Sequence, residues 1–379
     1  MRDKNFFKAL ATLTGTIIGV GLFSLPYITS KVGLWTMLGY FLVLGAVTIL
    51  VNFIYGEIVL RTKEHHRLPG YAQKYLGGWA KKLSFFSNSI GLGGALLAYL
   101  IVGGSFLFSL FNPIFGRSYS FYVLLMFFIG VFLIYFGIKS ISQAESVLLI
   151  LFFVVLIFIF QKGFSMIELK NLVNFDLAHI FLPYGAILFS ISGMSLIPEI
   201  REMLKQKPED LKKIIFYSVL ISILVCLVFS VIVTGITGKN TSQDAISGLR
   251  NIFSNGIISL ALIFGFLTVF TSFLTIGLTL KKILWYDMGM KKNLSWFLAC
   301  FVPLFLFFLG LNDFITIISL AGGIFIGIDV ALIILIYLQA KKKGDLEPAY
   351  SLNFPNPLIY SLITFFILGV IYEIYYFVF

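Results

Sequence analysis

Long apolar stretches alternate with short polar segments along the whole chain. Each stretch has about 17 to 28 residues, enough for an α-helix to cross a bilayer core of roughly 30 Å. The stretches lack the strict polar–apolar alternation of a membrane β-barrel, so helices are the structure that satisfies their backbone in lipid. The pattern predicts eleven membrane spans, at 7–30, 33–60, 83–111, 121–138, 144–161, 180–200, 214–237, 256–280, 294–310, 314–338 and 357–379.

Composition agrees with this reading and excludes several functions. Hydrophobic residues make up 59% of the 379 residues and charged residues only 12%, about half the 25% of a typical soluble domain. The chain carries no nucleotide-binding loop and no assembled set of acids, histidines or metal-ligand cysteines. We therefore predict an all-α polytopic membrane protein that is not an enzyme and has no cofactor.

The net charge of +11 is distributed unevenly between the two sides of the membrane. Of the 28 Lys and Arg residues, 22 fall in segments on the same side as the N-terminus and six on the opposite side. Lys and Arg accumulate on the cytoplasmic side of membrane proteins. The charge is therefore interpreted as an orientation signal and not as a nucleic-acid surface. We expect a multi-pass protein of the cell (plasma) membrane with a cytoplasmic N-terminus.

Two of the spans contain Gly, Ser and Pro near their centres. Span 7–30 carries "GTIIGVGLFSLP", and span 180–200 carries "PYGAILFSISGMSLIPE". These spans lie five apart and therefore run in opposite directions through the membrane. A pair of interrupted segments at matching positions of two inverted halves indicates the binding site of a secondary transporter. The alternative is that the small residues only allow neighbouring helices to pack closely.

A helix break at mid-membrane has a definite chemistry. It frees N–H and C=O groups, which cost several kcal/mol each in hydrocarbon unless a ligand or cavity satisfies them. The N-terminal end of the resuming half-helix suits a carboxylate, and free carbonyls suit an ammonium group or a metal cation. A broken pair thus fits both ends of a zwitterion, which favours an amino acid as substrate.

The stretches "GTIIGVGLFSLP", "LFSISG" and "FTSFLTIGL" resemble the amino acid–polyamine–organocation superfamily, which has the LeuT-type fold. Within it the chain is most similar to the aromatic/hydroxy amino acid permeases, followed by the amino acid/auxin permeases. The resemblance implies a 5+5 inverted repeat with discontinuous helices 1 and 6 and an additional eleventh helix. It divides the chain into a first five-helix repeat at 1–164, a second, inverted repeat at 165–340, and a cytoplasmic hinge with helix 11 at 341–379.

The resemblance also implies roles for residues at the two breaks. The substrate carboxylate would meet the amides around Val20 and Gly21. The amine would meet the carbonyls of Ile17, Phe189 and Ser190 near the Ser192 hydroxyl, with the Phe189 ring closing over the substrate from the outer side. The full set of predicted substrate-binding residues is Gly15, Thr16, Ile17, Gly19, Val20, Gly21, Asn88, Phe189, Ser190, Ser192 and Gly193. Asn88, Gly91, Ala95 and Tyr99 follow each other at helical spacing and would share one helix face. This face either lines a cavity or packs against a neighbouring helix.

Sodium is a possible coupling ion. In the family fold an adjacent hydroxyl pair on helix 8 binds sodium together with carbonyls of helix 1, and the matching positions are Gly15, Ile18, Thr271 and Ser272. The alternative is that these hydroxyls bond to their own helix. Proton-coupled relatives often carry a Lys on helix 5, and span 144–161 has none, which favours sodium. The aromatic branch is usually proton-coupled, however, so Na⁺ and H⁺ both remain open.

Ionisable residues within or near spans are functional candidates by default. They are Glu57, Glu145, Glu199, Asp329 and Glu373. Glu57 and Glu199 lie near the predicted cytoplasmic ends of their spans, and Arg61 and Arg201 are close to them in sequence. Each glutamate could therefore belong to a gate or to an ion pair at the membrane interface. Asp329 lies deeper and is the preferred proton-sensitive or inner-gate residue. The coupling or gate candidates are therefore Asp329, Glu57 and Glu199.

Together these features predict a secondary active transporter of aromatic or neutral amino acids. It would work by alternating access, as a symporter driven by Na⁺ or H⁺. An exchanger or uniporter, or a substrate-sensing receptor on a transporter fold, is the alternative. The expected partners are an amino acid and the lipid bilayer, with no nucleic acid.

Overall fold

The computed structural model describes residues 2–137, 151, 154–155, 157–252 and 255–378. Within these residues the secondary structure is helical, and seven continuous helices are long and apolar enough to cross a membrane. A bent pair of helices at the N-terminus makes an eighth span. The predicted span 144–161 and Glu145 lie largely outside the described residues, although 157–163 is helical.

The unbroken helices begin and end within a few residues of the predicted spans, because apolar length and the flanking polar segments define both. Six of them belong to the seven long helices: α3 (Leu34–Arg61), α5 (Gly78–Phe115), α6 (Tyr119–Phe136), α10 (Asp210–Thr237), α11 (Asn255–Lys282) and α15 (Asn356–Val378). The seventh long helix is the tenth span, and α12 (Lys292–Phe308) is a shorter apolar helix. Shorter elements join them: α4 (Leu68–Leu76), η2 (Phe164–Met166), η3 (Leu169–Leu172), η4 (Leu177–His179), η6 (Gly238–Asn240), η7 (Ser247–Asn251) and η8 (Ile283–Asp287).

The first span is broken where the sequence predicts it. Helix α1 (Arg2–Ile17) ends, and the chain resumes as the 3₁₀ turn η1 (Val20–Ser24) followed by α2 (Leu25–Val32). The two parts are bent by 42°. Gly19 has an extended backbone, with φ −98° and ψ −152°. A Cβ at this position would collide with the Tyr99 hydroxyl, so glycine allows α5 to approach the break.

The sixth span is also broken. Helix α8 (Pro183–Ile191) stops at Ser192 and Gly193, and the chain continues as η5 (Met194–Leu196) and α9 (Ile197–Met203). Ser192 has a ψ of 124°, which is incompatible with an α-helix. The predicted discontinuity of helices 1 and 6 is confirmed.

The tenth span has a feature that the sequence analysis does not anticipate. Helix α13 (Phe314–Leu320) passes into the π-helical turn η9 (Ala321–Ile326) and then into α14 (Gly327–Lys343). The turn coincides with the glycine-rich stretch "LAGGIFIGI". Such π-helical turns within α-helices occur often at functional sites.

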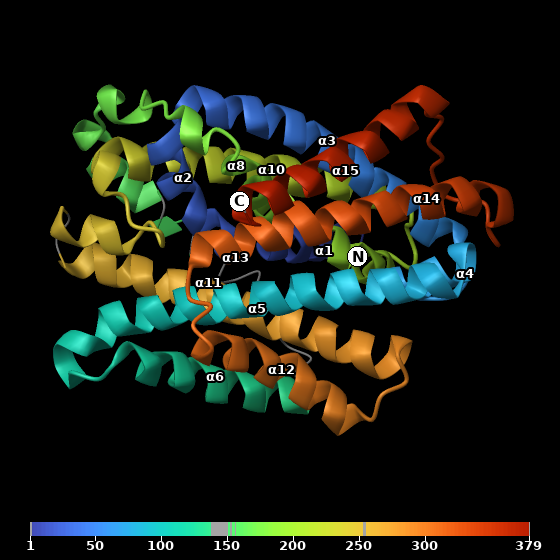
Figure 1. The fold of residues 1–379 in the computed structure, drawn as a ribbon, viewed down its shortest axis with the longest axis horizontal. Helices are drawn as coiled ribbons and strands as arrows, with labels where there is room; N and C mark the ends of the chain where they lie inside the picture. The colour runs from blue at the N-terminus through green and yellow to red at the C-terminus, as the bar shows by residue number, and fades with distance from the viewer. Residues whose placement is uncertain (1, 138–150, 152–153, 156, 253–254, 379) are drawn as a thin grey trace.

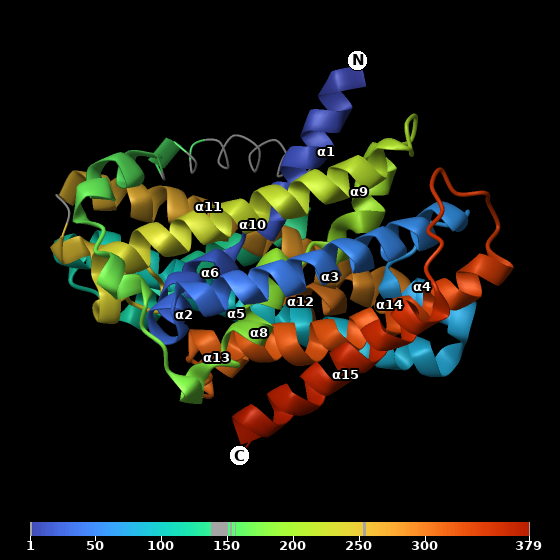
Figure 2. The same cartoon turned by 90° about the horizontal axis from the view of Figure 1, so that it is seen from above.

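The helices form an elongated bundle that places both breaks in its interior (Figure 1). Helix α8 packs against α3 and η9, and α1 packs against α10 and α11. Helix α5 contacts α11, α6 and η9. Helix α15 lies at one edge of the bundle against α14, and the two chain termini lie on opposite sides of it (Figure 2).

Candidate functional site

A cavity of about 90 Å³ lies between the two helix breaks, several times the roughly 10–15 Å³ that one water requires. Five spans contribute to it. The lining residues are Thr16, Ile17, Gly19 and Gly21 of the first span; Phe189, Ser192, Met194 and Ser195 of the sixth; Asn88, Gly91, Leu92, Ala95 and Tyr99 of α5; Ile276 of α11; and Ala321, Phe325, Ile326 and Asp329 of the tenth.

The predicted substrate-binding residues fall into two groups. Those lining the cavity are Thr16, Ile17, Gly19, Gly21, Asn88, Phe189 and Ser192. Gly15, Val20, Ser190 and Gly193 neighbour them in the chain but are not among the lining residues. The Ser190 hydroxyl donates to the Ala186 carbonyl of its own helix at 2.7 Å, so any substrate contact by Ser190 would come from its backbone.

The two breaks touch each other at backbone distance. A Cβ added at Gly21 would lie 2.5 Å from Ser190 Oγ, 2.9 Å from Ser190 Cα and 3.0 Å from Phe189 Cδ1. A Cβ at Gly193 would lie 2.7 Å from Ile17 Cγ1. The glycines of both motifs therefore allow a contact that no larger residue could make without displacement.

The first break offers polar backbone to the cavity. Because η1 continues into α2, Val20 and Gly21 supply the first amides of a helical segment, which have no acceptor within it. Such amides, at the positive end of the helix dipole, attract anions. Within the break, the Gly19 amide donates to the Ile17 carbonyl at 2.8 Å. This backbone is suited to a carboxylate.

Asp329 contributes a carboxyl side chain to the cavity lining. It is 4% exposed, and its Oδ2 accepts a hydrogen bond from Asn88 Nδ2 at 2.8 Å. Its Oδ1 has no donor within the described part of the chain. Of the lining residues described, Asp329 alone has a carboxyl or basic side chain. One of its oxygens is therefore available to a proton or to a ligand.

Helix α1, which contains Gly15 and ends just before Ile18, contacts α11, the helix that carries Thr271 and Ser272. The Thr271 hydroxyl donates to the carbonyls of Leu267 and Thr268, at 3.1 Å each. It therefore bonds to its own helix, which is the alternative to sodium binding. A donating hydroxyl keeps lone pairs for a cation, so sodium binding by Gly15, Ile18, Thr271 and Ser272 stays a prediction. The described residues contain no cluster of three or more His, Cys, Asp or Glu that could hold a metal.

An ion pair lies beyond one end of the cavity. A second, much smaller cavity shares Asn88 and Ser195 with the first and extends to Arg67, in the segment between α3 and α4. Arg67 Nη2 donates to Glu199 Oε1 on α9 at 2.5 Å. The expected pairing of Glu199 with Arg201 is wrong, because residues two apart on a helix point in different directions.

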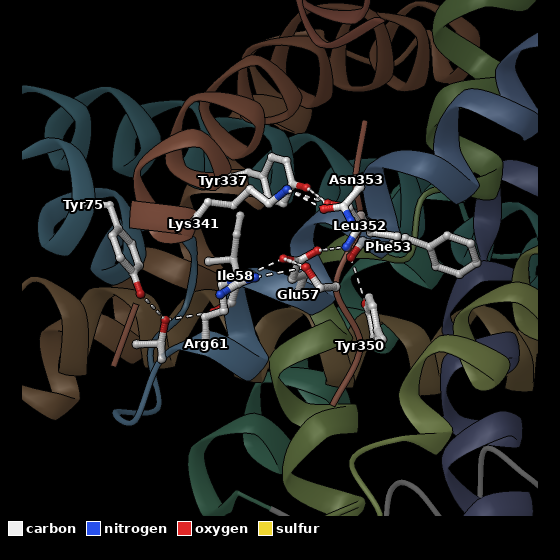
Figure 3. Close-up of polar contacts among 12 residues, drawn as sticks. Phe53, Glu57, Ile58, Arg61, Tyr75, Tyr337, Lys341, Tyr350, Leu352 and Asn353 are labelled. Atoms are coloured by element: carbon white, nitrogen blue, oxygen red, sulfur yellow. Dashed lines mark hydrogen bonds and ion pairs between the residues drawn. The ribbon is translucent and has the colours of Figure 1, made fainter. Parts of the chain in front are cut away.

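Glu57 belongs to a different network (Figure 3). Its carboxylate is fully buried; it accepts from Arg61 Nε at 2.8 Å and from the Leu352 amide at 2.6 Å. The Tyr337 hydroxyl and Lys341 Nζ donate to the Leu352 carbonyl, at 2.7 and 2.6 Å. Glu57 therefore links α3 to the hinge before α15, and α14 bonds to the same hinge residue. Glu57 does not line the cavity.

Several lining residues escape sequence reasoning. Phe325 and Ala321 reach the cavity from the π-helical turn, and Met194 and Ser195 from η5. The glycine-rich stretch "LAGGIFIGI" could have indicated Ala321 and Phe325, because glycines within a span favour an irregular helix.

A helical membrane bundle in which two discontinuous spans enclose one cavity has the architecture of a secondary transporter. Two solved structures share the fold. One is described as the crystal structure of MhsT in complex with L-phenylalanine, with a TM-score of 0.67, 14% identity and coverage of 97% of this chain and 98% of that one. The other is described as Mhp1, a nucleobase-cation-symport-1 family transporter, in a closed conformation with bromovinylhydantoin bound. Its TM-score is 0.68 and its identity 11%, with 97% and 92% of the two chains covered.

The chain matches the tryptophan/tyrosine permease family over residues 2–373 and belongs to it. A curated relative, glutamine transporter 2 of Aliivibrio fischeri (strain ATCC 700601 / ES114), is 24% identical over 361 residues, which is 92% of each chain. The protein is thus a membrane-embedded amino acid permease and not an enzyme. The expected relation to the aromatic branch of the superfamily is confirmed.

Proposed function

We propose that this permease carries an aromatic or other neutral amino acid across the membrane by alternating access, in symport with Na⁺ or H⁺. The observation that carries the proposal is the meeting of the two breaks at one cavity, with Gly21 against Ser190. In this proposal the substrate carboxylate binds the amides of Val20 and Gly21. The substrate amine binds the carbonyls of Ile17, Phe189 and Ser190.

The aromatic preference is supported by the side chains around the cavity. Phe189, Tyr99 and Phe325 come from three different spans and line it together. Aromatic rings attract each other in edge-to-face or offset arrangements, by about 0.5–1.5 kcal/mol beyond area burial. The family name, with its tryptophan and tyrosine, points the same way, whereas the curated relative is named for glutamine.

Two groups compete for the coupling role, and single substitutions separate them. The free Oδ1 of Asp329 supports a proton, and the packing of α1 on α11 supports sodium at Thr271 and Ser272. Replacing Asp329 by Asn should abolish proton-driven accumulation and spare sodium-driven accumulation. The double change Thr271→Ala and Ser272→Ala should do the reverse.

The proposal is tested with purified protein in liposomes. Uptake of a labelled amino-acid panel is measured under an inward sodium gradient, an inward proton gradient, and neither. Accumulation above equilibrium under one gradient supports symport with that ion. Counterflow without gradient-driven accumulation would indicate an exchanger or uniporter, and saturable binding without any flux would indicate a receptor. Absence of both binding and flux for the whole panel would refute the proposed function.

A further inference from the structure

A second buried carboxyl lies outside the cavity lining, on α15. Glu373 is 1% exposed, and neither of its carboxyl oxygens has a hydrogen-bond partner within the described residues. A charge buried in a protein without a partner costs several kcal/mol, and carboxyls inside membrane spans are rare for this reason. Burial without a partner therefore disfavours a charged carboxylate at Glu373 in this conformation.

The carboxyl enters a very close contact between α8 and the π-helical turn η9. A Cβ at Gly323 of η9 would lie 2.6 Å from Glu373 Cδ. A Cβ at Gly185 of α8 would collide with both Glu373 Oε1 and the Ser319 carbonyl oxygen. A Cβ at Gly322 would lie 2.8 Å from the Gly185 carbonyl carbon. Three glycines thus bring the backbones of α8 and η9 together around one carboxyl.

No cation in the described residues balances a charge at this contact. The titratable groups near Glu373 are Tyr40 on α3, Tyr184 on α8, and Tyr372 and Tyr376 on α15 itself. Residues 314–328, which form α13, η9 and the start of α14, carry no charged side chain. The hydroxyls of Tyr184 and Ser319 are also buried without partners among these residues. A carboxylate here would have no counter-ion.

The contact is mechanically connected to the cavity. Phe189 on α8 and both Ala321 and Phe325 on η9 line the cavity. A negative charge on Glu373 would favour the entry of water or a counter-ion between α8 and η9. Separation of these two elements would displace two walls of the cavity.

We propose that Glu373 is a proton-binding site, and that binding of its proton closes α8 onto η9 and so completes the cavity. In the predicted orientation α15 begins on the cytoplasmic side, and Glu373 lies near its other end, so the proton would come from the outer solution. The site takes up one proton as its carboxylate becomes a carboxylic acid, and it returns that proton to water when the contact opens. The link to transport rests on the proposed function; the protonation itself does not.

The occupant is a proton and not a metal ion for a steric reason. The contact leaves no room for a Cβ at Gly185, Gly322 or Gly323. A sodium or calcium ion requires several oxygen ligands at more than 2 Å around it. A proton requires only the carboxyl oxygen.

Infrared spectroscopy of the purified protein tests the protonation without any substrate. At neutral pH, the carbonyl stretch of a protonated carboxyl should be present in the wild type and reduced in Glu373→Gln. The matched control is Glu347→Gln, which replaces an exposed glutamate in the hinge and should leave the band unchanged. An identical band in the wild type and Glu373→Gln would overturn the proposal. Should Glu373→Gln not fold, the same band is followed in Asp329→Asn, where its persistence supports Glu373 and its complete loss overturns the proposal.

The coupling is tested by the pH dependence of substrate affinity. One linked proton predicts that log Kd of the wild type rises by up to about one unit per pH unit once the solution is alkaline enough to remove it. Glu373→Gln should bind with the wild-type affinity of acidic solution and show no such slope. A slope that survives in Glu373→Gln but disappears in Asp329→Asn would assign the linked proton to Asp329 and overturn the coupling. If the wild type binds no amino acid, the proposed function fails while the infrared result for Glu373 still stands.

Discussion

Replacing Gly21 by Ala tests whether the contact between the two breaks supports substrate binding. The added methyl would lie 2.9 Å from Ser190 Cα, whereas ordinary contacts of this kind measure 3.4–4 Å. Two backbone segments must therefore separate by about 0.5–1 Å, and overpacking of this size costs about 1–3 kcal/mol. The left-handed backbone region is not involved, because Gly21 is not among the glycines with positive φ. The effect should thus be purely steric.

The expected result is a loss of substrate affinity. Since about 1.4 kcal/mol corresponds to a factor of ten, Kd should rise by about 5- to 150-fold. Binding of labelled amino acid to the purified protein measures it, with thermal stability recorded in parallel. The control is Gly39→Ala on α3, where an added Cβ has no atom within 4 Å. If Gly21→Ala binds substrate as the wild type does and is equally stable, the two breaks do not need to touch and the proposed site is wrong.

Three further predictions concern Arg67, Glu57 and Asp345. Arg67→Ala removes the partner of Glu199. Since a partly exposed ion pair contributes about 1 kcal/mol, labelling of a Ser195→Cys variant from the side on which Arg67 lies should accelerate by about fivefold; unchanged labelling would exclude a gate at this pair. Glu57→Ala leaves Arg61 Nε and the Leu352 amide without their acceptor and should lower the free energy of unfolding by about 3 kcal/mol. Its melting temperature should then be lower than that of the wild type and of Glu347→Ala. Equal melting temperatures would show that Glu57 does not hold the hinge in place. A hydrogen bond from Lys74 holds the pKa of Asp345 below its usual range. A carboxyl with a lowered pKa stabilises the fold when the pH is above its ordinary pKa, and this stabilisation is lost as the pH falls. The wild type should therefore be more stable than Asp345→Asn at neutral pH and should lose that advantage below about pH 4. Parallel curves of stability against pH for the two proteins would refute the assignment.

The features that could be read from the sequence are those encoded over a few neighbouring residues. Apolar length predicts each span, Lys and Arg placement predicts orientation, and Gly, Ser and Pro within a span predict where its helix breaks. The breaks at Gly19 and Ser192 were therefore predictable to within a residue or two. The glycine at position 21 was likewise recognisable as significant, although its contact with Ser190 was not.

Side-chain partnerships were decided only by the tertiary structure. Asn88 and Asp329 are 241 residues apart, and Arg67 and Glu199 are 132 apart. Whether such residues meet depends on how each helix is rotated about its axis and which helices are neighbours. Hydropathy carries little information on this, because in an apolar span most faces look alike. The position of Glu373 illustrates the same limit. The sequence placed the Glu373 carboxyl inside the last span. Only the packing of α15 showed that this carboxyl is buried against the glycines of α8 and η9, two elements that also line the cavity.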